Sequence, residues 1–161
     1  MLTHIKAGLL ILLTLLLVGC GFQLRGGENL APELKEIALT GDDKSQFYRI
    51  VAARLERAGA TLVPATSTTP VLSIASLGQS NTVASVNSRA DALEYAMRFG
   101  TRFTLTMPDE PVQVFNVTFN RSFLDKSSQA LASSREQAQL RQQMEFEAAE
   151  QIVRHLNRLT F

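Results

Sequence analysis

The feature that most limits how this chain can fold is an alternation of apolar and polar residues from Leu93 to Met107. Apolar side chains occupy almost every second position, and the positions between them hold polar, small or charged residues, including Arg98 and Arg102. Because successive side chains of a strand point to opposite faces, this pattern predicts a long strand with one buried face. A strand of this length would run roughly 50 Å, longer than usual, so we expect a bend or break at Gly100.

Further extended segments accompany this strand. A short strand is predicted over residues 36–40 and a second over Val71 to Leu77. The alternation of the second changes phase near Leu77-Gly78, which indicates a bulge, and a continuation through residues 81–86 is left open. The segment 112–123 alternates again and predicts the next strand. Polar turns separate the last three strands, so we expect them to be neighbours in one sheet.

Two segments have helical periodicity instead. In the first, apolar residues recur at helical spacing from Phe47 to Ala58. Asp43 is the predicted N-cap, with Gln46 completing a capping box. Gly59 is predicted to close the helix as its C′ residue, because glycine adopts positive φ without steric cost.

The second helical segment ends the chain. It is predicted to run for about 30 residues to Leu159, with Ser127 or Ser128 as its cap. Together the segments have the order β-α-β-β-β-α, and each helix has one apolar face. This order predicts an α+β fold: a two-layer sandwich in which two helices pack on one face of a sheet of about four strands. The other sheet face, which carries Arg98 and Arg102, is predicted to meet water or a polar partner.

The N-terminus has the features of a secretory signal. Lys6 precedes an apolar run from Leu9 to Val18, and no acidic residue occurs before Glu28. The run is shorter than the roughly 20 residues that span a bilayer. Its end, Leu17 to Cys20, resembles the lipobox of bacterial lipoproteins.

The lipobox resemblance implies cleavage before Cys20 and lipidation of that residue. The expected parts are then a signal peptide over 1–19, an acylated tether over 20–32 and a single domain over 33–161. Gly21 in place of an aspartate favours the outer membrane, by resemblance to the lipoprotein sorting rule. The alternative is an ordinary signal or a buried helix, with Cys20 as a free thiol. Cys20 is the single cysteine, so no disulfide can form within the chain.

Charge and residue types restrict the function further. The chain has 16 Lys and Arg against 15 Asp and Glu, and the signal peptide contains one of the cations, Lys6. This balance argues against non-specific nucleic-acid binding, which requires a basic excess. Beyond the signal peptide His155 is the single histidine, predicted to be a surface helix residue. The patterns of a zinc site, a catalytic triad and a phosphate-binding glycine loop are missing, so we expect no metal, no cofactor and no enzymatic activity.

Basic residues give the better indication of a ligand. Several fall where predicted strands, turns and the last helix begin or end, and clustered arginines bind phosphates well. Each of them, taken alone, is also explained as a solvated surface charge. The candidates are Arg89, Arg98, Arg102, Arg121, Lys126 and Arg135.

Short segments spread along nearly the whole chain carry a family resemblance. They are Leu17 to Arg25, Thr82 to Val86, Glu94-Tyr95, Arg121 to Phe123, Ala130 to Ala132, and Met144 to Leu156. In this order and spacing they are similar to the lipopolysaccharide-assembly lipoprotein family LptE. The resemblance implies a two-helix, four-stranded sandwich that acts as a plug inside the β-barrel LptD and helps to place lipopolysaccharide in the outer leaflet. It also implies a location at the outer membrane, held by the lipid on Cys20.

In that family, basic residues at a hairpin tip and near the start of the last helix are implicated in binding lipid A phosphates. The aligned positions here are about Ser88 and Ser133, with Arg89 and Arg135 close by. We therefore assign Arg89, Arg135, Lys126 and Arg121 as candidate lipopolysaccharide-binding residues, and Arg98 and Arg102 as candidate barrel contacts. Two other functions remain open. A stand-alone carrier of lipid or glycan would need an apolar cavity of ligand size, and a periplasmic hydrolase would need a pocket with perturbed acids.

Overall fold

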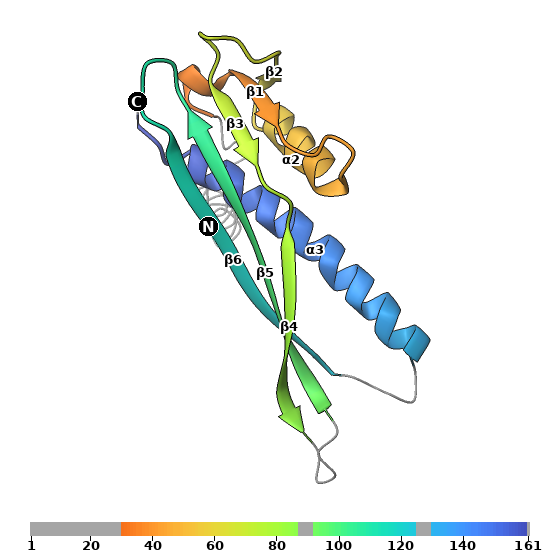
Figure 1. Ribbon diagram of the computed structural model, residues 1–161. Helices are drawn as coiled ribbons and strands as arrows, with labels where there is room; N and C mark the ends of the chain where they lie inside the picture. Colours follow the sequence, from red (N-terminus) through yellow and green to blue (C-terminus); the bar gives the residue numbers. More distant parts are fainter. Residues whose placement is uncertain (1–29, 87–91, 125–129, 161) are drawn as a thin grey trace, which may run out of the picture.

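The structure is a computed structural model that describes residues 30–86, 92–124 and 130–160. Figure 1 shows how its helices and strands are arranged. In chain order they are η1 (Pro32–Leu34), β1 (Glu36–Thr40), α2 (Gln46–Arg57), β2 (Thr61–Leu62), β3 (Val71–Ile74), β4 (Gly78–Val86), β5 (Ala92–Thr106), β6 (Gln113–Leu124) and α3 (Ala130–Leu156).

The strands form one mixed sheet. β1 pairs in parallel with β2 on one side and with β3 on the other. β5 is antiparallel to β3, β4 and β6 and lies at the centre of the longer strands. The sheet thus has six strands rather than the predicted four or so, because the strand expected from Val71 and its open continuation to Val86 form two separate strands, and the brief β2 adds another. The α+β class and the two helices are confirmed.

β3 and β4 occupy the same side of β5, one after the other. β3 pairs with the C-terminal end of β5, where Ile74 is opposite Phe103. β4 pairs with the N-terminal part, where Gly78 is opposite Gly100. β5 continues through Gly100, so of the bend or break expected there the break is wrong. The interruption lies in the neighbouring strand, at the phase shift seen near Leu77.

The buried face of the sheet follows the predicted alternation. Met97, Phe99, Phe103 and Leu105 of β5 are fully buried, and Val117 of β6 is almost so. Each such side chain contributes about 1.5–3 kcal/mol when it leaves water. The alternation thus fixes which face of β5 points inward, because a shift of one residue would expose this whole set.

The helices cover this buried face (Figure 1). α3 runs along the long strands, and α2 lies beside it next to β1. α3 contributes Met144, Ile152 and Leu156 to the core, while α2 contributes Val51 and Leu55. Among the described residues, no helix is both long and apolar enough to cross a membrane.

The start of α2 differs from the prediction. Ser45, not Asp43, is the N-cap, and its hydroxyl accepts a hydrogen bond from the Tyr48 N–H at 3.1 Å. Asp42 forms the turn before it: its carboxylate accepts from the Lys44 N–H, and its carbonyl accepts from the Ser45 hydroxyl. Asp43 therefore lies within the turn, and the N-cap is two residues later than predicted.

The helix ends agree better with the sequence. Gly59 has φ 91° and follows the end of α2, as predicted. Its N–H donates to the Glu56 carbonyl, and the Ala60 N–H donates to the Leu55 carbonyl, each at 3.0 Å. This pair of bonds is the Schellman arrangement that a glycine at C′ permits. α3 stops at Leu156, slightly before the predicted end, and its expected serine cap lies outside the described residues.

Candidate functional site

The outward side of the sheet is the best candidate for a binding surface. Residues paired across antiparallel strands point to the same face, so the register defines its members. We call these residues the polar face: Gly78, Ser80, Arg98, Gly100, Arg102, Asn116, Thr118 and Asn120. Apart from the partly covered Gly100, all of them are exposed.

The polar face is arranged in rows that cross the strands. Arg98 is flanked by Ser80 on one side and Asn120 on the other. Two residues along β5, Gly100 is flanked by Gly78 and Thr118. Because a glycine has no side chain, this second row is lower than the first.

The next row contains Arg102 opposite Asn116. The Arg102 Nε–H donates to the Asn116 amide oxygen at 3.4 Å, which directs the guanidinium along the surface. Shallow hollows of about 290 and 390 Å³ meet over Gly78 and Gly100, with Arg98 lining one and Arg102 the other. The row of Gly78, Gly100 and Thr118 is therefore the floor of a shallow trough, with Arg98 on one side and Arg102 on the other.

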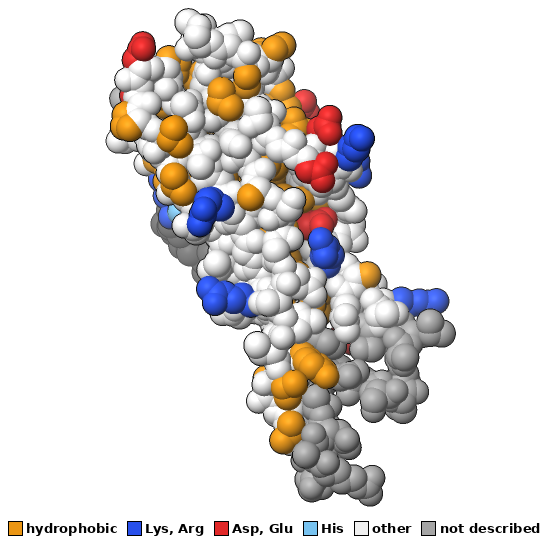
Figure 2. Space-filling view, in the orientation of Figure 1, with side chains coloured by type: hydrophobic (Ala, Val, Ile, Leu, Met, Phe, Trp, Pro, Cys, Tyr) orange, Lys and Arg blue, Asp and Glu red, His pale blue; other side chains and the backbone are white. Residues whose placement is uncertain are grey.

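The charge of this face is not balanced locally. Of the described residues, no carboxylate lies within 4.0 Å of the guanidinium of Arg98 or Arg102. In Figure 2 most of the acidic side chains in view lie on the side of the helices and others at the upper left end, whereas the long strands show blue groups on a largely uncharged surface. The polar face therefore carries net positive charge although the chain as a whole is nearly neutral.

The candidate lipopolysaccharide-binding residues are placed differently. Arg121 projects from β6 and forms an ion pair with Glu147 of α3, with Nη2 and Oε2 at 2.8 Å. Arg121 thus joins the sheet to the helix, an arrangement that sequence analysis did not predict. Arg135 is exposed on α3. Arg89 and Lys126 lie outside the described residues, as does the lipidation candidate Cys20.

His155 lies on α3 as predicted, but it is half-buried rather than freely exposed at the surface. Its ring lies 6.0 Å from the ring of Phe103 and 5.9 Å from that of Phe115. These two phenylalanine rings stack on each other at 4.9 Å. These ring contacts place the His155 side chain on the edge of α3 that meets the sheet.

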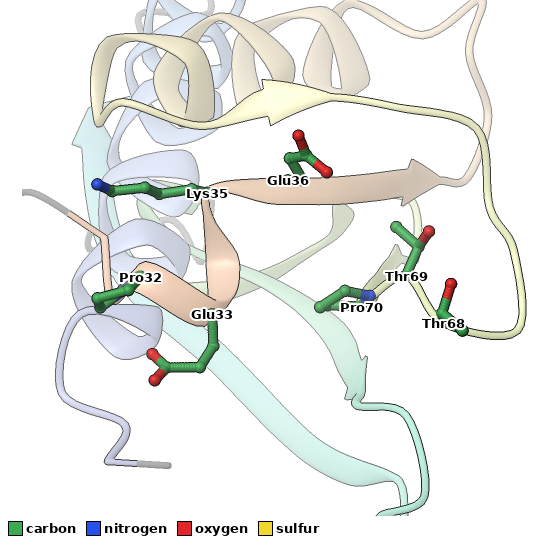
Figure 3. Close-up of a pocket in the computed structure, with 7 residues that line it drawn as sticks. All are labelled: Pro32, Glu33, Lys35, Glu36, Thr68, Thr69 and Pro70. Atoms are coloured by element: carbon green, nitrogen blue, oxygen red, sulfur yellow. The ribbon is translucent and has the colours of Figure 1, made fainter.

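A separate hollow of about 450 Å³ lies near the start of β1 (Figure 3). It is lined by η1, the beginning of β1 and the loop before β3, including Glu33, Lys35 and Thr69. The charged ends of Glu33, Lys35 and Glu36 point in different directions rather than converging. This hollow is therefore neither the apolar cavity that a lipid carrier needs nor a convergent catalytic pocket. No group of three or more His, Cys, Asp and Glu is placed to hold a metal ion among the described residues.

These features define a class: a two-layer α+β domain that presents a polar, cationic sheet face. The family model described as "LptE: Lipopolysaccharide-assembly" matches residues 34–156. The chain belongs to the LptE family of lipopolysaccharide-assembly lipoproteins.

Relatives and solved structures support the same assignment. The chain is 32% identical to the LPS-assembly lipoprotein LptE of Pectobacterium atrosepticum, over 92% of this chain and 81% of that protein. It is 30% identical to the protein of the same name in Yersinia enterocolitica, over 92% of this chain and 72% of the relative. The crystal structure of rare lipoprotein B from Shewanella oneidensis has a TM-score of 0.71 at 26% identity and covers 75% of this chain and 92% of that chain. A minor lipoprotein from Acinetobacter baumannii shares the fold, with a TM-score of 0.62 at 16% identity and coverage of 77% and 91%.

Proposed function

We propose that this chain is lipidated on Cys20, is held at the outer membrane, and acts with the β-barrel LptD to place lipopolysaccharide in the outer leaflet. Within this complex it serves as a plug and an assembly aid for the barrel. The observation that carries the proposal is the polar face: a continuous, exposed sheet surface backed by a filled core. The membership of the LptE family supplies the link to lipopolysaccharide assembly.

A plug needs a well-packed core and a polar surface, and this domain has both. Met97, Phe99 and Phe103 fill the space between sheet and helices and are fully buried. Because these side chains point inward, the side chains on the opposite face of β5 are the ones that can contact a partner. The lumen of a transmembrane barrel is polar, so Arg98, Arg102 and the asparagines beside them suit its wall.

Lipopolysaccharide binding is proposed at Arg89, Lys126 and Arg135, with a smaller part for Arg121. Arginine donates paired hydrogen bonds to phosphate, and lysine supplies a point charge. Arg121 already shares its charge with Glu147, so a phosphate must compete with that carboxylate. Arg135 is exposed and available to a ligand.

The test is co-purification. The full-length chain with an affinity tag is isolated from detergent-solubilised outer membranes, and the bound proteins are identified by mass spectrometry. We expect a β-barrel protein, and we expect that barrel to misassemble when the chain is depleted. Recovery of the chain without a barrel would refute the proposal. If lipid or glycan were recovered in place of a barrel, the stand-alone carrier would be the better interpretation.

A further inference from the structure

The residues that line the trough on the polar face indicate what kind of ligand it binds. Gly78 and Gly100 form its floor, and Thr118 extends that floor onto β6. Arg98 and Arg102 are four residues apart on one side of β5, which places their Cα atoms roughly 13 Å from each other on opposite sides of the floor. Both side chains are long enough to lean over the glycines from either side.

Among the described residues, both arginines lack an acidic partner, whereas several other arginines of this domain have one. Arg54 pairs with Glu150, Arg121 with Glu147 and Arg141 with Glu145. Apart from the Arg102 Nε–H, which donates to Asn116, the guanidinium donors of both arginines are open to a molecule outside the chain, in a fork geometry that matches carboxylates.

The neighbouring strand favours a polypeptide as that molecule. In the described sheet, β4 pairs only with β5, so its outer edge has free backbone donors and acceptors. From Gly78 to Val86 it contains no charged residue and no proline, the usual means by which edge strands avoid pairing. An extended segment that crosses the trough meets both this edge and the two arginines.

We propose that the trough over Gly78 and Gly100 receives acidic side chains from an extended segment of the protein partner, with Arg98 and Arg102 each holding a carboxylate. This inference rests on the proposed function, because the partner is the barrel. It adds the chemistry of the contact: aspartate or glutamate on the barrel side, at positions about four residues apart in an extended chain.

A charge-preserving substitution makes the contact detectable. Arg98→Lys and Arg102→Lys each place an amine in the trough. A carbodiimide couples an amine to a carboxylate in contact with it, which forms an isopeptide bond while the carbodiimide takes up the water and becomes a urea. Outer membranes with the full-length variants are treated with the carbodiimide, and linked peptides are identified by mass spectrometry. We expect links from positions 98 and 102 to Asp or Glu of the barrel. Arg57→Lys, at an exposed position of α2, is the matched control and should give no link to the barrel.

A second pair of variants measures the contribution to assembly. A Cβ added at Gly78 would meet only the Gly100 carbonyl oxygen, at an ordinary 3.5 Å, so Gly78→Val should fold while filling the trough. We expect Gly78→Val, and the double variant Arg98→Glu/Arg102→Glu, to recover about tenfold less barrel than the wild type, as expected for the loss of a charged contact. Circular dichroism checks that each variant is folded.

The outcomes separate the two proposals. If the wild-type chain recovers no barrel, the proposed function fails. If it recovers the barrel but positions 98 and 102 give no link to it, or if Gly78→Val and the double variant recover as much barrel as the wild type, this inference is wrong and the proposed function stands. If Arg98→Glu/Arg102→Glu retains the barrel but loses binding to purified lipopolysaccharide, the trough receives lipid phosphates instead, which also overturns the inference.

Discussion

Substitution of Gly41 by alanine should destabilise the domain through two separate effects. Gly41 follows β1 with φ 153°, a conformation that side chains rarely adopt. An added Cβ would lie 2.8 Å from the carbonyl oxygen of Ile74 and 3.0 Å from its Cγ1. The closest atom belongs to the backbone at the end of β3, so it cannot move aside as the tip of a flexible side chain would.

The expected magnitude follows from these contacts. Forcing a non-glycine residue into such a backbone region costs about 1–3 kcal/mol. An overpacked contact adds about 1–3 kcal/mol. Gly41→Ala should therefore lower the free energy of unfolding by about 2–6 kcal/mol.

Gly59→Ala is the matched control, because Gly59 also has a positive φ, of 91°, but nothing lies within 4 Å of its added Cβ. It should cost only the backbone strain, about 1–2 kcal/mol. The assay is equilibrium unfolding in urea, monitored by circular dichroism. The free energies of unfolding are compared from the urea midpoints, provided that the dependence of the free energy on urea concentration is the same for all variants. Equal losses for the two variants would show that the close approach to Ile74 contributes nothing and would refute the reasoning.

Three further predictions concern the proposed roles of single residues. The side chains of Arg121 and Glu147 are 47% and 34% exposed, so their ion pair should contribute little to stability. A double-mutant cycle with alanine, measured by urea unfolding, should give a coupling energy of about 0.2–1 kcal/mol. Zero coupling would show that the ion pair does not stabilise the domain. Arg89→Asp combined with Arg135→Asp should weaken binding to purified lipopolysaccharide while leaving the circular dichroism spectrum intact, and unchanged binding would remove both residues from the site. Cys20→Ala should prevent acylation, as read by mass spectrometry of the intact protein, and an acylated variant would contradict the assignment of Cys20.

Much of the fold could be predicted from the sequence because its strongest patterns are local. The alternation from Leu93 to Met107 located β5 to within one residue at each end and identified its buried face. Gly59 was found at the end of α2 because the need for positive φ restricts the choice of residue. The cap was misplaced because Asp43 and Ser45 both satisfy capping preferences, and only the turn built by Asp42 decides between them.

The site was predicted less completely because it depends on contacts between distant segments. Alternation placed Arg98 and Arg102 on the outward face, but the trough exists only because Gly78 pairs with Gly100, and that register cannot be deduced from either segment alone. The pairing of Arg121 with Glu147 joins residues far apart in the chain and has no local signal. His155 was assigned to the surface because the packing of two phenylalanines against it requires the sheet and helix together.

The continuity of β5 past the gap between β3 and β4 has a mechanical consequence. One half of this strand is held between β3 and β6, and the other between β4 and β6. Ala75 to Leu77 lie outside both flanking strands, so among the described residues the two halves are joined by β6 and by the backbone of β5 itself. Phe99 belongs to the half beside β4 and Phe103 to the half beside β3, so one unbroken strand ties both ends of the hydrophobic interior together.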